Sequence, residues 1–197
     1  SGLQFEESST STNSDQSSLE MVVAETSDSQ LRVMDRAYVK ATLDGIFGPS
    51  IAAITNARVD QMVSEFGGPC DSYTDLNGCP VSGSTQFSVV ASTVPAREAL
   101  RVRACDQIVA NDAALLFATR HIQESISSLS GLATPTQSDI ELAYDLFYTG
   151  RDMPETVRTA LSDVVKTAEG QSPAWPKSEA WRFLFLTLCL ASDWQTP

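Results

Sequence analysis

Apolar residues recur at intervals of three and four over most of the chain after residue 30, which is the spacing of one face of an α-helix. The first such segment, 31–47, stops at Gly48-Pro49, and we expect Asp28 or Ser29 to cap its N-terminus. A second helix is expected over 50–66, because the proline suits a first helical turn and two glycines follow the segment. Together the two segments predict a helical hairpin.

The rest of the chain repeats the helical spacing. Thr93 and Ser178 stand where two helices would be capped, and Thr136 with Asp139 forms a capping-box sequence at a third. Residues 85–94 alternate weakly and are either a short strand or extended chain. The further predicted helices are 95–109, 112–122, 136–148 and 154–170, followed by a last helix that Ser178 caps. This pattern predicts an all-α domain, with six or seven helices in one orthogonal or irregular bundle.

The first 29 residues differ in composition from the rest. They are rich in serine, threonine and acidic residues and contain one short apolar patch, so they cannot bury enough apolar surface to fold alone. We therefore divide the chain into an extended acidic tail, 1–29, and a single helical domain, 30–197. We expect the tail to lie on a partner protein; packing on its own domain is the alternative. The expected partner-binding residues are Leu19, Met21, Val22 and Val23, together with Tyr73 in the loop described next.

The cysteines indicate where the protein matures. Cys70 and Cys79 lie in a polar, turn-rich loop, 67–80, which we interpret as closed by a disulfide and as a surface for recognition. Cys105 and Cys189 lie inside predicted helices and are either joined to each other, closing a loop of about 85 residues, or two buried thiols. This usage predicts an oxidising, extracytoplasmic compartment.

Charge and hydropathy limit the partners. The net charge of −12 argues against nucleic acid and against direct binding to anionic lipid, because both require a basic surface. The longest apolar run, 183–191, is about half the length of a membrane span and predicts a buried helix. Ser1-Gly2 before a serine-rich tether resembles the residues that follow the lipid-carrying cysteine of a bacterial lipoprotein. A lipid anchor outside this chain is therefore the one membrane contact that we expect.

The sequence contains few residues suited to catalysis or metal binding. His121 is the only histidine, which excludes a metal site with two histidines from this chain. The cysteines show no C-x-x-C spacing, and no G-x-S-x-G sequence supplies a serine nucleophile. Residues 71–78 carry oxygen ligands suited to calcium, but Tyr73 stands where an EF-hand needs an acid. We therefore expect no catalytic residue, metal or cofactor, and we place His121 near a helix C-terminus.

Aromatic residues cluster in two predicted helical regions. Core packing is the more common role of such clusters, and a hydrophobic ligand pocket is the alternative. The residues are Tyr144, Phe147 and Tyr148 in one region and Trp181, Phe183, Phe185 and Trp194 in the other.

Three segments, 32–39, 43–48 and 179–194, resemble parts of helical extracytoplasmic proteins of unknown function in myxobacteria, planctomycetes and predatory bacteria. The likeness covers less than a quarter of the chain. Some of those proteins accompany secreted cytochromes, although no haem-attachment sequence is present here. The resemblance implies an envelope location and no particular activity.

Two functional hypotheses follow. The favoured one is a non-enzymatic accessory or structural subunit of a bacterial envelope assembly, which docks on other protein chains through its tail and its cysteine loop. The alternative is a helical ligand-binding or enzymatic domain with an aromatic pocket.

Overall fold

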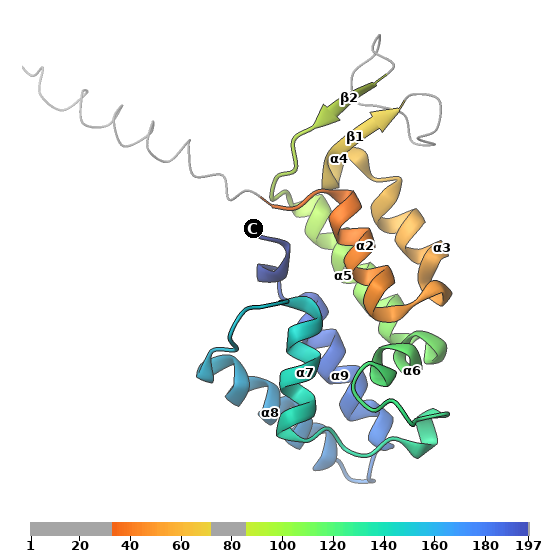
Figure 1. The fold of residues 1–197 in the computed structure, drawn as a ribbon, viewed down its shortest axis with the longest axis vertical. Helices are drawn as coiled ribbons and strands as arrows, with labels where there is room; N and C mark the ends of the chain where they lie inside the picture. Colours follow the sequence, from red (N-terminus) through yellow and green to blue (C-terminus); the bar gives the residue numbers. More distant parts are fainter. Residues whose placement is uncertain (1–32, 72–85, 197) are drawn as a thin grey trace, which may run out of the picture. The chain divides into compact units, whose positions relative to one another are not determined.

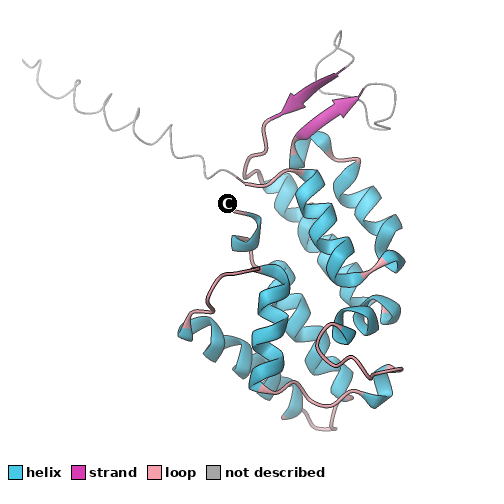
Figure 2. Cartoon of the chain, in the orientation of Figure 1, coloured by secondary structure: helices cyan, strands magenta, loops and turns pink. Residues whose placement is uncertain are grey.

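The structure, a computed structural model, describes residues 33–71 and 86–196, with the side chains of Asp71 and of 86–89 left out. Figure 2 shows that helices make up most of this part of the chain, which confirms the predicted all-α class. These described residues belong to one compact unit. No helix among the described residues is long and apolar enough to span a membrane.

The first described helix, α2 (Arg36–Phe47), starts later than the spacing predicts. Residues 33–35 are not helical, and the N-cap is Asp35, not Asp28 or Ser29. The Asp35 carboxylate accepts a hydrogen bond from the backbone N–H of Tyr38 at 3.1 Å and so satisfies one of the free amides of the first turn. The helix ends at Gly48, whose φ of +77° favours glycine.

The second predicted helix, 50–66, is not continuous. It consists of a 3-10 turn η1 (Pro49–Ile51), α3 (Ala52–Thr55), a π-helical turn η2 (Asn56–Asp60) and α4 (Val63–Phe66). From Ile51 to Val63 its buried residues stand four apart, which exceeds the 3.6 residues of an α-helical turn, and the wider π turn keeps them on one face. These residues are Ile51, Thr55, Val59 and Val63, and Phe66 is buried three residues further on.

Two short strands follow, β1 (Gly68–Asp71) and β2 (Gln86–Val89), and they pair antiparallel with Cys70 opposite Phe87. The strand alternative is therefore correct for 86–89, while 90–94 is extended chain without strand pairing. The sequence did not predict β1, because its partner lies 18 residues further on and the segment itself is polar and rich in turn residues. Figure 1 shows the hairpin beyond the ends of α4 and α2.

The remaining helices are α5 (Pro95–Ala110), α6 (Asp112–Arg120), α7 (Gln137–Phe147), α8 (Glu155–Glu169) and α9 (Lys177–Leu190), with short 3-10 turns η3 (Leu129–Gly131) and η4 (Asp193–Gln195). The capping box of Thr136 and Asp139 is present at the start of α7. Thr93 and Ser178 are not N-caps: Val94 and Pro176 hold those positions, because α5 starts at a proline and α9 starts directly after one. His121 is the C-cap of α6, as predicted.

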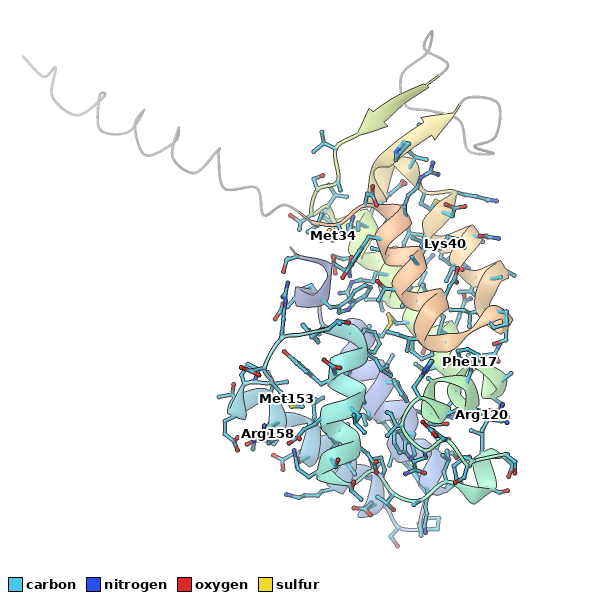
Figure 3. All side chains as sticks on the ribbon, viewed as in Figure 1. Met34, Lys40, Phe117, Arg120, Met153 and Arg158 are labelled. Carbon is cyan, nitrogen blue, oxygen red and sulfur yellow. A yellow bond between two sulfur atoms is a disulfide. The ribbon has the colours of Figure 1, made fainter. Side chains whose placement is uncertain are left out.

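The core draws buried residues from α2 and from α5 to α9. Helices α5 and α9 pack against each other in it and are joined by a disulfide between Cys105 and Cys189. Their Cα atoms are 5.8 Å apart and neither side chain is exposed, so the disulfide alternative is correct and the free-thiol alternative is wrong. Figure 3 shows this bond in yellow near the centre of the helices. Cys70 is also disulfide-bonded, and its predicted partner Cys79 lies outside the described residues.

Arg97 is a fully buried cation that joins three parts of the chain. Its guanidinium donates to the carbonyl oxygens of Phe66 at 3.2 Å and Met34 at 2.7 Å, and to the side-chain oxygen of Gln195 at 2.7 Å. It also lies 4.7 Å from the centre of the Phe66 ring. Burial lowers the pKa of Arg97, partly offset by the nearby charge of Glu98. Through these bonds the N-terminal end of α2, the end of α4 and the C-terminal turn are held together.

Candidate functional site

The residues predicted to bind partners are Leu19, Met21, Val22, Val23 and Tyr73, and all five lie outside the described residues. The predicted roles of the tail and of the cysteine loop therefore stay predictions. So does the resemblance to envelope proteins.

His121 lies at the exposed end of α6, where its ring meets the edge of Phe117 with a centroid distance of 5.3 Å. Figure 3 labels Phe117 and the neighbouring Arg120. Within 33–71 and 86–196, no group of three or more histidine, cysteine, aspartate or glutamate side chains is placed to hold a metal ion.

The predicted aromatic clusters divide between the core and the surface. Phe147, Trp181, Phe185 and Trp194 are fully or almost fully buried, and their rings contact one another at centroid distances of 5.7 to 6.0 Å. The indole N–H of Trp181 donates to the carbonyl oxygen of Ala133 at 2.8 Å, which satisfies it inside the core. For these four residues the core-packing interpretation is confirmed.

Phe183 points outward from α9 and stacks on Trp175, which lies in the segment before that helix. The two ring centroids are 5.5 Å apart and the ring planes differ by 15°. Trp175 is 43% exposed and Phe183 is 37% exposed. Covering a stacked, half-exposed pair of large aromatic rings with a partner lowers the free energy, because it removes apolar surface from water.

This aromatic pair borders a hollow of about 490 Å³ between α8 and α9. A second hollow of about 290 Å³ lies further along the same two helices, and both are lined by Ala160 and Thr187. We call the two together the α8–α9 trough. The first hollow is lined by Ala160, Asp163, Val164, Thr167, Ala168, Gln171, Trp175, Phe183 and Thr187. The second is lined by Tyr144, Tyr148, Pro154, Thr156, Val157, Ala160, Leu161, Thr187, Leu188, Ala191 and Asp193.

The floor of the trough is made of small residues whose polar atoms already have partners. The hydroxyl of Thr187 donates to the carbonyl oxygen of Phe183 at 2.8 Å, and that of Thr167 donates to the carbonyl oxygen of Asp163 at 2.7 Å. Each hydroxyl therefore bonds to its own helix, as threonine commonly does. Consequently these side chains offer mainly methyl groups, and the trough is apolar over most of its surface.

Two stacked tyrosines form the other end of the trough. The rings of Tyr144 and Tyr148 lie 4.3 Å apart with 7° between their planes, and both side chains are largely buried. Burial, and then the charge of Asp193, raises the pKa of Tyr148 from 10.0 to about 12. Burial also raises the pKa of Tyr144. Both phenols thus stay neutral at physiological pH.

Two charged residues in the described part of the chain line the trough, Asp163 in the first hollow and Asp193 in the second. Lys166 lies 3.7 Å from Asp163, but both side chains are mostly exposed, so this ion pair is weak. On its other side Trp175 borders a smaller hollow of about 190 Å³, whose charged residues are Glu169 and Lys177.

Trp175 is the residue of this site that the sequence reasoning missed. Its neighbours Pro173 and Pro176 mark a stiff connection, and we did not assign the tryptophan a role. A tryptophan placed between prolines, outside any apolar periodicity, is a signal that could have found it, because such a ring has no helix face to bury it.

The trough can bury apolar side chains and can attract positive charge, and its lining threonines are already hydrogen-bonded within their helices. Comparisons of the chain with protein-family models, with curated proteins and with solved structures found no match.

Proposed function

We propose that this chain is a non-enzymatic accessory or structural subunit of a bacterial envelope assembly, and that it holds a segment of a partner protein in the α8–α9 trough. The observation that carries the proposal is the stacked pair of Trp175 and Phe183, which is half exposed at the edge of an apolar hollow.

The energetic argument concerns the tryptophan. Tryptophan and other large aromatic residues dominate protein interfaces because they bury much apolar area at little cost in side-chain entropy. Trp175 is held in place by its stacking on Phe183, so little further ordering is required when a partner binds.

The proposed location rests on the cysteines. The Cys105–Cys189 disulfide and the disulfide-bonded Cys70 are compatible with an oxidising compartment outside the cytoplasm. We place the protein in the periplasm or at the outer membrane, with a lipid anchor outside this chain as its membrane contact. The tail and the cysteine loop would supply further contacts with partner chains.

A second candidate is a ligand-binding domain, since a hollow of about 490 Å³ has the size of many small-molecule sites. The hollow shares Phe183 with the pocket expected from the sequence, and Tyr144 and Tyr148 line the neighbouring hollow. Phe147 and Trp181, in contrast, lie in the core.

Site-specific photo-cross-linking separates these two functions. A photoreactive phenylalanine analogue would replace Trp175 in the full chain, in cells that produce the protein naturally, and mass spectrometry would identify adducts. The control carries the same analogue at Val102, which is 46% exposed on α5 and does not line the trough. We expect a discrete protein adduct from position 175 alone. An adduct with a small molecule would favour the second candidate, and equal protein adducts at both positions would contradict a specific site.

A further inference from the structure

We infer that the occupant of the α8–α9 trough is an amphipathic α-helix of a partner protein, with apolar residues facing the trough and lysine or arginine residues at its margins. This inference rests on the proposed function and names the chemistry of the partner. Three properties of the trough carry it: its length, its floor and its charge.

The length fits a helix. The lining residues of α8 run from Thr156 to Ala168 along one face of the helix, and Gln171 follows its C-terminal end. At 1.5 Å per residue the stretch 156–168 measures about 18 Å, a little over three turns of an occupant helix. Figure 1 shows α8 and α9 side by side, and they pack against each other as consecutive helices. A groove of this kind between two helices is a common docking place for a third.

The floor allows a close approach. Ala160 and Thr187 lie in the middle of the trough, where its two hollows meet, while aromatic rings stand at both ends. Small residues at the centre let the backbone of an occupant approach, and the rings then contact its larger side chains. An extended peptide is disfavoured, because the trough offers no strand edge and the Thr167 and Thr187 hydroxyls are already bonded within their own helices.

The charge decides between occupants. One carboxylate lies in each hollow, Asp163 and Asp193, and among the described residues no lysine, arginine or histidine lines either hollow. Lys166 is 3.7 Å from Asp163 and mostly exposed, so it can turn toward solvent. Beside the second hollow, Arg151 acts on the two tyrosines, but its guanidinium donates to the carbonyl oxygen of Thr196 and does not line the trough. A second copy of this chain is disfavoured as the occupant. Each copy has a net charge of −12 and the same two carboxylates in its trough, so the two copies would repel each other. A helix with basic margins matches both carboxylates.

Two synthetic peptides test the inference on the full, disulfide-bonded protein. Both are helices of about 18 residues with leucine and alanine on one face. One peptide carries lysine at all the remaining positions, and the other carries glutamate at those positions. Fluorescence anisotropy measures their binding. We expect the lysine peptide to bind about tenfold more tightly at about 20 mM salt, and this ratio to fall toward one at about 500 mM salt.

Three variants locate the binding. Ala160→Trp fills the floor from an exposed position and should weaken both peptides at least about tenfold. Asp163→Asn with Asp193→Asn should weaken the lysine peptide about three- to tenfold at low salt. The matched control is Asp106→Asn with Glu124→Gln, which removes two exposed carboxylates outside the trough and should change binding less than twofold.

The inference is overturned if the glutamate peptide binds as well as the lysine peptide, if the control variant weakens binding as much as the trough variant, or if Ala160→Trp has no effect. A dimer of the protein that Ala160→Trp dissociates would also overturn it, in favour of a second copy as occupant. These results are distinct from failure of the proposed function, because a protein adduct at position 175 with no preference for the lysine peptide would leave that function standing.

Discussion

Arg97 and Gln195, 98 residues apart in the chain, share a buried hydrogen bond of 2.7 Å between the guanidinium and the side-chain amide oxygen. The backbone of Gln195 in turn accepts from the N–H of Met34 at 2.7 Å, and Met34 accepts from Arg97 at the same distance. Three segments far apart in sequence therefore meet at the planar guanidinium of Arg97. No other side chain presents its donors in the same arrangement.

Replacing Arg97 with lysine should lower the free energy of unfolding by about 2 to 4 kcal/mol, because a lysine cannot reach three acceptors and leaves buried carbonyl groups unpaired. Urea unfolding measures this change. Arg103→Lys is the control, since Arg103 is exposed on the same helix, and it should change stability by less than about 0.5 kcal/mol. Equal effects of the two substitutions would show that the hydrogen bonds of Arg97 contribute nothing to the free energy of unfolding.

Removing the disulfide between α5 and α9, by Cys105→Ala with Cys189→Ala, should lower the free energy of unfolding by about 4 to 5 kcal/mol. The bond joins residues 84 positions apart and so restricts the unfolded chain strongly. Guanidinium unfolding with and without reductant measures it. Reductant should affect the parent protein much more than this variant. A variant that unfolds at the parent's midpoint would mean that the bond adds no stability.

Two glycines near the end of α2 should respond in opposite directions to alanine. Gly48 has a φ of +77°, and a Cβ there would lie 2.6 Å from the Phe117 ring, so Gly48→Ala should cost about 1 to 3 kcal/mol. Gly45 lies inside the helix with open space around it, and Gly45→Ala should stabilise by about 0.5 to 1 kcal/mol. Thermal unfolding measures both. A stabilising Gly48→Ala would contradict the described turn.

Stability should fall as the pH rises from about 10 toward 12. Burial raises the pKa of Tyr148 to about 12 from the ordinary 10.0, so the folded protein holds this proton more tightly than the unfolded chain. That contribution is complete below pH 10 and is lost as the pH passes through the folded value. Denaturant unfolding at pH 9 and 11.5, with absorbance at 295 nm, measures it. Tyr148→Phe should show a smaller fall, and parallel curves for the two proteins would contradict the assignment.

The helices of this chain were predictable where the signal is local. Thr136 and Asp139 bond to each other's backbone within four residues, so the sequence alone indicates the start of α7. The start of α2 was not predictable in this way. Several residues before it can act as caps, and the one used, Asp35, directly follows Met34, whose carbonyl is fixed by Arg97. Contacts across the fold decide such a boundary.

The candidate site was less predictable than the helices. Helix α9 is apolar on most sides, so its sequence does not show that Phe183 faces out while Phe185 faces the core. The sequence also leaves open whether Cys105 pairs with Cys189, because only the packing of α5 on α9 brings their Cα atoms to 5.8 Å. Pairing of β1 with β2 likewise depends on a contact distant in sequence.

The Cys105–Cys189 bond also determines how the molecule would carry a mechanical load. Tension along the chain passes from residue 105 to residue 189 through the two sulfur atoms, so the 84-residue interval between them lies outside the path of the force. At about 3.4 Å per extended residue, roughly 280 Å of chain cannot be drawn out. All of α8 and nearly all of α9 belong to that interval. A pull would therefore straighten other parts of the chain first and leave Trp175, Phe183 and the α8–α9 trough enclosed in a covalent ring.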